Sequence, residues 1–236
     1  MARSELLRVQ HAGMVINLTS KEQELAVNQA LLLTLEHLAA KFKVLAVHQK
    51  QWLLSDITRE LRHCFPDTDF HCHFQNTSIR PDGGILYLQG PPNDELTYPI
   101  LIAEVKNQGT NDRRLEEGLK KQAKGNAIER LGKNAIGLRT ALMRESIFPF
   151  VCFGYGCDFA EDSSILDRVS TIAMFGKLNT THLHNEEGGK FNRGSFYFRR
   201  ERWSVDEMAT VMKDIAEQSV LYYFSKFRED HFLQRS

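Results

Sequence analysis

Two apolar, β-rich runs separated by a turn constrain the fold of this chain more than any other stretch. The first run spans residues 85–88 and the second spans residues 98–103, with glycine and proline between them. This arrangement predicts a β-hairpin. If its loop is centred near Asn93, residues equally distant from Asn93 face each other, and Asp82 lies opposite Glu104. Directly opposed residues have Cβ atoms about 5 Å apart. The sequence therefore predicts that two carboxylates meet on one face of a sheet.

A lysine joins this predicted pair of acids. Glu104 and Lys106 are separated by one residue on a strand, so both side chains point to the face that carries Asp82. Two carboxylates suit a hard divalent cation such as Mg²⁺, which completes its shell with water and phosphate oxygens. Such a cation stabilises charge on a phosphodiester and lowers the pKa of bound water. An ammonium group would offset further negative charge in the transition state. The three residues together predict hydrolysis of a phosphate ester.

Each half of this pattern also has a purely structural interpretation. A Glu-x-Lys sequence at the end of an apolar strand is often a solvated strand terminus, and Pro-Asp-Gly-Gly at residues 81–84 is a common turn sequence. The hairpin geometry brings the two halves together, and this favours the catalytic interpretation.

Three segments, taken in order, resemble EcoRI-like type II restriction endonucleases, within the Pro-Asp...Asp/Glu-x-Lys nuclease superfamily. They are residues 78–85 (Ser-Ile-Arg-Pro-Asp-Gly-Gly-Ile), 103–109 (Ala-Glu-Val-Lys-Asn-Gln-Gly) and 125–130 (Gly-Asn-Ala-Ile-Glu-Arg). The superfamily motif is short, and the hexapeptide makes the match specific. The resemblance covers residues 74–222. It implies a three-layer α/β/α fold with a mixed central sheet, an Mg²⁺ cofactor, double-stranded DNA as the substrate, and a homodimer.

The resemblance also implies roles for single residues. Asp82 and Glu104 would hold Mg²⁺, while Lys106 would support the attacking water. In such enzymes the Gly-Asn-Ala stretch crosses the DNA major groove in extended form, and an asparagine can bond an adenine edge in two places. The residues that would contact DNA are Gln108, Asn126, Ala127, Arg130 and Arg168, with Glu129 organising their network. The implied site is a palindrome with an AATT core, cut outside that core to leave 5′ overhangs.

Apart from the resemblance, the segment around Asn126 has a simpler explanation. Asn126 followed by Glu129 matches a capping box at the start of a helix from Ala127 to about Glu145. On this interpretation, Glu129 and Arg130 are solvated charges.

Length and charge are those of one globular domain with a local basic region. The 236 residues, of which 42% are hydrophobic, predict a single domain over residues 1–236. Within it we expect an arm at 1–20, the catalytic hairpin at 76–106 and a recognition segment at 107–145. The net charge of zero argues against a uniformly basic nucleic-acid binder. Between Lys106 and Arg144, however, basic residues outnumber acidic ones by ten to four, directly after the catalytic strand.

The chain carries no sign of secretion or membrane insertion. Its four cysteines lack the spacing of a disulfide framework, and its amino terminus lacks the apolar region of a signal peptide. No run approaches the roughly 20 apolar residues that cross a bilayer. We therefore expect free thiols in the cytoplasm of a bacterial or archaeal cell.

Periodicity predicts several further elements. Three helices are expected, at residues 21–42, 49–64 and 203–227. Ser20 would cap the first helix and Ser204 the last. The first helix would bury an apolar stripe formed by Leu25, Leu32, Leu35 and Leu38. Strands are expected at 146–156, 171–175 and 195–198.

A group of histidines and cysteines at residues 63–64 and 71–73 suggests a metal at first sight. Its spacing does not match the usual zinc patterns, in which paired ligands lie two to four residues apart. Phenylalanine and cysteine alternate with polar residues over 70–75, which favours a half-buried strand leading to the hairpin.

Two other functions remain open beside a type II restriction endonuclease. A repair or recombination nuclease would use the same chemistry but recognise DNA structure, and would cut without regard to AATT. A non-cleaving DNA-binding module could keep the fold, although the intact pair of acids and the lysine argue against it.

Overall fold

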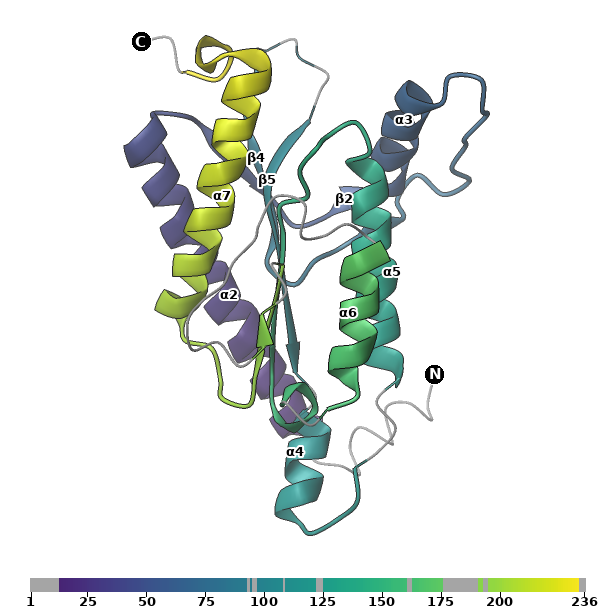
Figure 1. The fold of residues 1–236 in the computed structure, drawn as a ribbon, viewed down its shortest axis with the longest axis vertical. Coiled ribbons are helices and arrows are strands. Elements are labelled where there is room, and N and C mark those ends of the chain that lie inside the picture. Colours follow the sequence, from purple (N-terminus) through teal and green to yellow (C-terminus); the bar gives the residue numbers. More distant parts are fainter. Residues whose placement is uncertain are drawn as a thin grey trace.

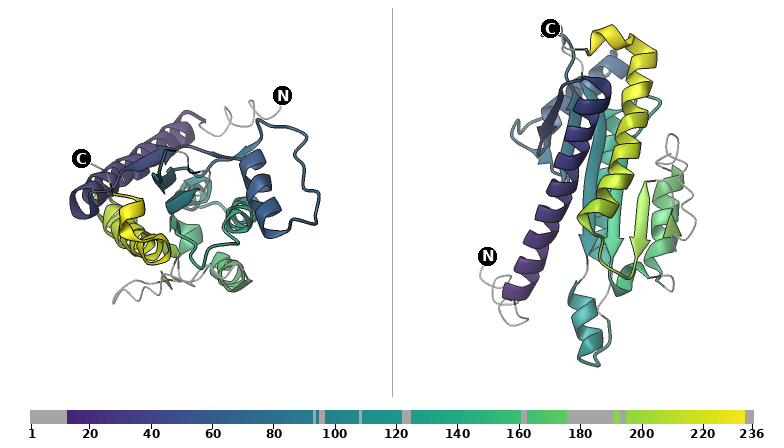
Figure 2. Two further views of the ribbon diagram at one scale, coloured as in Figure 1. Left: turned by 90° about the horizontal axis from the view of Figure 1, so that it is seen from above. Right: turned by 90° about the vertical axis from the view of Figure 1, so that its left-hand side faces the viewer.

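The chain folds into three layers, with a mixed sheet between two layers of helices (Figure 1). A computed structural model describes residues 13–92, 94, 97–107, 109–121, 125–160, 163–175, 191–192 and 195–233; at 13–20, 109–110, 125–127, 173–175 and 191–192 it describes the backbone alone. Seen from above, the two helical layers lie on opposite sides of the strands (Figure 2). This arrangement confirms the α/β/α prediction.

The central sheet has six strands in the order β1-β4-β5-β6-β8-β7. Strand β5 pairs with β4 in antiparallel fashion and with β6 in parallel fashion, which makes the sheet mixed. The strands are β1 (Ala46–Gln49), β4 (Gly84–Leu88), β5 (Tyr98–Asn107), β6 (Phe150–Tyr155), β7 (Phe191–Asn192) and β8 (Phe196–Arg199). A separate two-stranded sheet pairs β2 (Trp52–Leu53) with β3 (Ser78–Ile79). Strands β4 and β6 are buried throughout, because helices cover both faces, and they therefore consist almost entirely of apolar residues.

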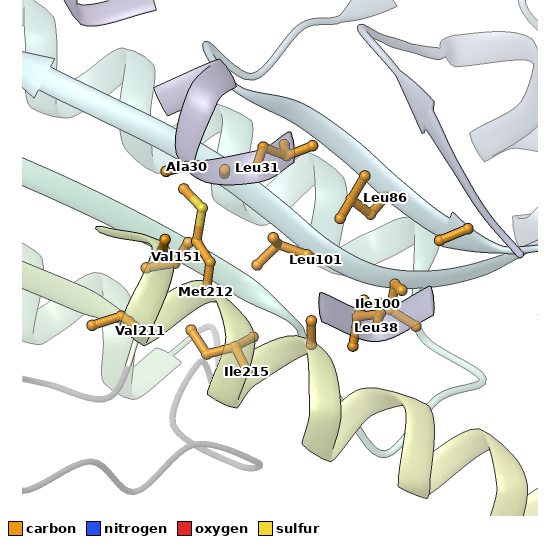
Figure 3. Close-up of a cluster of buried hydrophobic side chains, with 14 of the residues drawn as sticks. Ala30, Leu31, Leu38, Leu86, Ile100, Leu101, Val151, Val211, Met212 and Ile215 are labelled. Carbon is orange, nitrogen blue, oxygen red and sulfur yellow. The ribbon is translucent and has the colours of Figure 1, made fainter. Parts of the chain in front are cut away.

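One face of the sheet is covered by α2 (Gly13–Phe42) and α7 (Val205–Phe227). Figure 3 shows the side chains that fill this layer, including Leu31 and Leu38 of α2, Met212 and Ile215 of α7, and Leu101 of β5. These side chains are all fully shielded from solvent. Burial of an aliphatic side chain of this size contributes about 1.5–3 kcal/mol, so this cluster is a major source of stability.

The opposite face is covered by α3 (Leu54–Cys64), α5 (Gly125–Ala141) and α6 (Ile165–Phe175). Helix α5 buries Ile128, Leu131, Ala135 and Leu138, which recur every three or four residues along one side of the helix. Helix α4 (Gly109–Glu116) follows β5, and the short 3₁₀ helix η1 (Cys157–Phe159) follows β6. A second 3₁₀ helix, η2 (Glu229–His231), follows α7. Strands β5 and β6 are parallel, so α4 and η1 lie at the same end of the sheet, at the bottom of Figure 1.

Several elements predicted from the sequence are confirmed. The hairpin is formed by β4 and β5, the predicted buried strand is β6, and the predicted strand at 195–198 is β8. Helix α7 begins after Ser204, whose hydroxyl accepts a hydrogen bond from the backbone of Glu207, while the Glu207 carboxylate accepts one from the backbone of Ser204. This is the expected capping box.

The first helix differs from its prediction in both its start and its buried face. Helix α2 begins at Gly13, so Ser20 does not cap it and residues 13–20 are not an arm. Leu25 and Leu32 are 63% and 55% exposed, whereas Val27, Ala30, Leu31 and Leu38 are buried. The positions of α7 and β5 determine which face of α2 is buried. The spacing of apolar residues within α2 was not sufficient to identify that face.

Other segments also differ from their predictions. Residues 70–75 do not form a strand, and Phe74 is 77% exposed. Strand pairing in this part of the chain starts only at Ser78, in β3. Residues 171–175 are the end of helix α6, whose Ile165, Val169 and Ile172 face α5 and the sheet. The helix predicted at 49–64 begins at Leu54, after strand β2.

Within the described ranges, no helix combines the length and the apolar character needed to cross a membrane.

We expect Ser204→Ala to lower the free energy of unfolding by about 1 kcal/mol, because it removes the side-chain acceptor at the start of α7. Urea denaturation monitored by circular dichroism would measure this. Ser225→Ala, an exposed position near the end of the same helix, is the matched control and should change little.

The same cap predicts a dependence on pH. Hydrogen bonds from the Arg199 guanidinium and from Ser204 lower the pKa of Glu207 to about 2. Its pKa is therefore lower in the folded than in the unfolded chain, so its contribution is complete above about pH 4.5 and is lost as the pH falls towards 2. The free energy of unfolding of the wild-type protein should therefore exceed that of Glu207→Gln above about pH 4.5, and this difference should shrink as the pH falls towards 2. A difference that stays constant over this interval would contradict the assignment.

Candidate active site

The hairpin brings the predicted acids together, but through a different register from the one expected. Near the tip, Leu88 pairs with Tyr98 as predicted, and an irregularity between Leu86 and Tyr87 then shifts the pairing by one residue. Gly84 consequently pairs with Ala103. The prediction that Asp82 lies directly opposite Glu104 in the ladder is therefore wrong, because the bulge adds one residue to β5.

A tight turn restores the contact between the two acids. The Gly84 N–H donates to the Pro81 carbonyl at 3.1 Å, which closes a turn over residues 81–84. The Asp82 backbone N–H then donates to Glu104 Oε2 at 2.9 Å. Asp82 thus contacts Glu104 through its backbone N–H.

Lys106 lies between the two carboxylates. Its Nζ donates to Asp82 Oδ2 at 2.8 Å and also forms an ion pair with the Glu104 carboxylate. The side chains of Glu104, Lys106 and Asp82 are 2%, 20% and 34% exposed, so the cluster opens to solvent on the side of Asp82. A ligand of these side chains would approach from that side.

Alternation along β5 sets the face on which this cluster lies. Ile102 packs into the layer of α5 and α6, whereas Ala103 and Val105 pack into the layer of α2 and α7. Glu104 and Lys106 continue the side of Ile102, because successive side chains of a strand point to opposite faces. The cluster therefore lies on the α5 and α6 face, next to the end of β5 at Asn107.

Burial dominates the electrostatics of the cluster. Burial raises the pKa of Glu104, while the ammonium of Lys106 acts in the opposite direction. For Lys106, burial alone would lower the pKa, but the carboxylates of Glu104 and Asp82 outweigh it and hold the pKa above its usual value. Lys106 therefore keeps its proton at neutral pH and acts as a hydrogen-bond donor and a positive charge, not as a base.

The residues present fit a hard divalent cation. Asp82 and Glu104 offer carboxylate oxygens, and the Glu104 carboxylate lies where burial makes a positive partner favourable. No cluster of three or more histidine, cysteine, aspartate or glutamate side chains able to hold a metal occurs among the described residues. A cation here would complete its shell with water and phosphate oxygens, as Mg²⁺ commonly does.

Two glycines and a histidine support the turn that carries Asp82. Gly84 has a φ of +81°, and a Cβ there would lie 2.5 Å from His48 Nε2. A Cβ on Gly83 would lie 2.8 Å from the Ala103 side chain. His48 Nε2 is 2.9 Å from the Gly83 carbonyl oxygen, so strand β1 braces the turn from the edge. Sequence reasoning missed His48, because no local pattern links it to a turn thirty-five residues away.

The other predicted site residues lie partly outside the described residues. Gln108 is one of these, as are the side chains of Asn126 and Ala127. The backbone of residues 125–127 forms the start of α5, so the extended path expected there is wrong. Because the helix begins at Gly125, Asn126 lies inside the first turn and does not cap it.

Glu129 and Arg130 of α5 and Arg168 of α6 are exposed, and their roles remain predictions. All three lie near the amino-terminal ends of their helices. The carboxyl ends of β5 and β6 are at the same end of the sheet, because the two strands are parallel. Helices α5 and α6 begin at that end and run back towards the start of the next parallel strand (Figure 1). The structure thus places these charges at the end of the molecule that carries Lys106.

We expect Gly84→Ala to lower the free energy of unfolding by about 3 kcal/mol, since strain at positive φ adds to a clash with His48 and the Gln49 carbonyl. Gly118 has a φ of +70°, and a Cβ there would meet no described atom within 4 Å, so Gly118→Ala carries the strain alone. It should cost about 1 kcal/mol. Equal losses in the two variants, measured by urea denaturation, would show that the turn is not packed as described.

Comparison with known proteins agrees with this geometry. The chain matches the family model for restriction endonuclease EcoRI over residues 10–165, which include Asp82, Glu104 and Lys106. It is 28% identical to the type II restriction enzyme RsrI of Cereibacter sphaeroides over 198 residues, which cover 70% of this chain and 71% of that enzyme. It is also 28% identical to the type II restriction enzyme EcoRI of Escherichia coli over 238 residues, or 85% of each chain. The chain belongs to the EcoRI family of restriction endonucleases.

Proposed function

We propose that this chain is a type II restriction endonuclease that hydrolyses phosphodiester bonds of double-stranded DNA in the cytoplasm of its cell. One observation carries the proposal: Lys106 bridges Asp82 and Glu104 at the solvent-facing end of the central strand, in a chain of this family. A structural ion pair would need one acid only, whereas two acids and one amine leave a net negative charge that suits a divalent cation, and such a cation can hold a phosphate substrate.

Asp82 and Glu104 are the residues that would hold Mg²⁺. When bound there, Mg²⁺ supplies positive charge to the scissile phosphate and lowers the pKa of water. Lys106, which keeps its proton, would donate a hydrogen bond to the attacking water and offset negative charge in the transition state. The Asp82 N–H donates to the buried Glu104 carboxylate, which would hold the two ligands next to each other.

The segment that follows β5 would read the DNA. We propose that Asn126, Ala127 and Arg130, with Gln108, contact an AATT core, that Glu129 organises this network, and that Arg168 makes a further contact. The chain would act as a homodimer, because a palindrome has twofold symmetry and each subunit can then read one half-site and cut one strand. Cleavage outside the core would leave 5′ overhangs.

Digestion of a plasmid of known sequence, followed by sequencing of the fragment ends, tests this function. With Mg²⁺ we expect cuts only at palindromes that contain AATT, with 5′ overhangs, and no cuts after chelation by EDTA. Cutting that ignores AATT would indicate a structure-specific nuclease instead. Binding without any cutting would indicate a non-cleaving DNA-binding module.

Lys106→Ala tests the proposed chemistry. We expect the cleavage rate to fall at least about 100-fold, since a donor to the transition state is lost. Affinity for specific DNA, measured by mobility shift without Mg²⁺, should change far less. Lys213→Ala on α7, on the opposite face of the sheet, is the control and should cleave normally. Full cleavage by the Lys106 variant would remove this residue from the mechanism.

A further inference from the structure

A second polar cluster, separate from the acids of the active site, joins α4 to the turn that follows β6. Asn111 and Asp112 come from α4, Lys121 comes from the chain after it, and Cys157 and Asp158 come from η1. We call Asn111, Asp112, Lys121 and Asp158 the α4 latch. Nothing in the proposed chemistry uses these residues.

The latch is reciprocal, because each element supplies a carboxylate to the other. Asp112 of α4 accepts a hydrogen bond at 2.6 Å from the backbone N–H of Cys157. Asp158 of η1 accepts one at 2.6 Å from the side-chain amide of Asn111. Asn111 and Asp158 are 2% and 1% exposed, so both groups are buried at the junction.

Lys121, which follows α4 in the chain, completes the latch. Its Nζ donates to the Cys157 carbonyl at 3.1 Å and lies 3.8 Å from Asp158 Oδ1. A buried carboxylate is costly unless it is paired and hydrogen-bonded, and Lys121 supplies the charge that Asp158 requires. Removal of this lysine would therefore weaken the hold on the chain that leads into α5.

The backbone after β6 is shaped around Asp112. Gly156 has a φ of +104°, and a Cβ there would lie 2.5 Å from Asp112 Oδ2. Only glycine combines this conformation with so close an approach to the carboxylate. The close fit indicates a defined docking position for α4.

Polar contacts, rather than apolar packing, set the position of α4. Among the described side chains of residues 111–120, Asn111 alone is buried, while Leu115 and Leu119 are 41% and 46% exposed. Figures 1 and 2 show α4 projecting beyond the end of the sheet, near the start of α2. Since the described side chains of α4 provide no buried apolar anchor, we expect α4 to shift when its polar contacts are lost.

The latch holds α4 and Lys121, which lie in the chain between strand β5 and helix α5. Helix α4 starts directly after the strand that carries Glu104 and Lys106, and Lys121 precedes the start of α5 at Gly125. We propose that the α4 latch fixes the DNA-reading segment relative to the catalytic strand and thereby sets the discrimination between the correct site and sites with one altered base pair. This inference rests on the proposed function, and its four residues are positioning residues that need not touch DNA.

Asp158→Asn and Lys121→Met test the latch. The readout is kcat/KM for a cognate oligonucleotide duplex divided by kcat/KM for a duplex with one altered base pair. We expect this ratio to fall about tenfold in each variant, equivalent to ~1.4 kcal/mol. The double variant should lose little more than either single one, because the two side chains contact each other and hold the same junction between α4 and η1.

Two controls separate positioning from stability and from charge. Glu60→Gln removes the charge of another buried carboxylate, which pairs with Arg144 on the far side of the molecule from α4, and should lower stability while leaving the ratio unchanged. If Lys121 merely touched a phosphate, its loss would weaken binding to both duplexes equally and would also leave the ratio unchanged.

Lys121 is partly exposed, so its replacement tests the latch even if the Asp158 variant does not fold. A wild-type ratio in Lys121→Met would overturn the latch. Failure of wild-type protein to cut either duplex would instead refute the proposed function, so the two results are distinguishable.

Discussion

The carboxylate of Glu104 lies almost fully buried at the end of the central strand, and the rest of the site follows from the need to compensate it. A charge in an apolar layer costs free energy unless it is paired and hydrogen-bonded. Lys106 supplies the pairing and the backbone N–H of Asp82 supplies a hydrogen bond. To deliver that N–H the chain must turn sharply before β4, which explains the two glycines at 83 and 84 and the support from His48.

The mixed sheet brings the acid–lysine cluster and the segments proposed to read DNA to one end of the molecule. On one side β5 pairs with β4, which brings in Asp82 from the antiparallel direction. On its other side β5 pairs in parallel with β6, which brings the turn after β6 to the same end of the sheet. The cluster of Asp82, Glu104 and Lys106, helix α4, η1 and the starts of α5 and α6 therefore lie at one end of the sheet. The two hydrophobic layers pack against the strands.

Polar interactions set the position of elements at this end of the molecule, whereas elsewhere they reinforce elements that are already packed. The ion pairs between α2 and α7, or between α7 and Glu145, reinforce elements that are already held by apolar packing. At α4 that packing is nearly absent among the described side chains, so hydrogen bonds and charge decide the geometry. Buried polar contacts of this kind contribute little net stability compared with apolar residues of equal volume, but they define a single arrangement.

The sequence alone determined the features that depend on neighbours in the chain. The hairpin, the shared face of Glu104 and Lys106, the buried strand β6 and the capping box of α7 all follow from alternation, turn residues or short spacing. The tertiary structure decided the bulge that shifts the register of β4 and β5, the face that α2 buries, the helical state of residues 171–175, and the contacts of His48 and Asp158. Each of these features depends on which distant segment of the chain packs against it. Many pairings between segments satisfy the same local sequence pattern, so only the burial of the whole core selects the pairing that is observed.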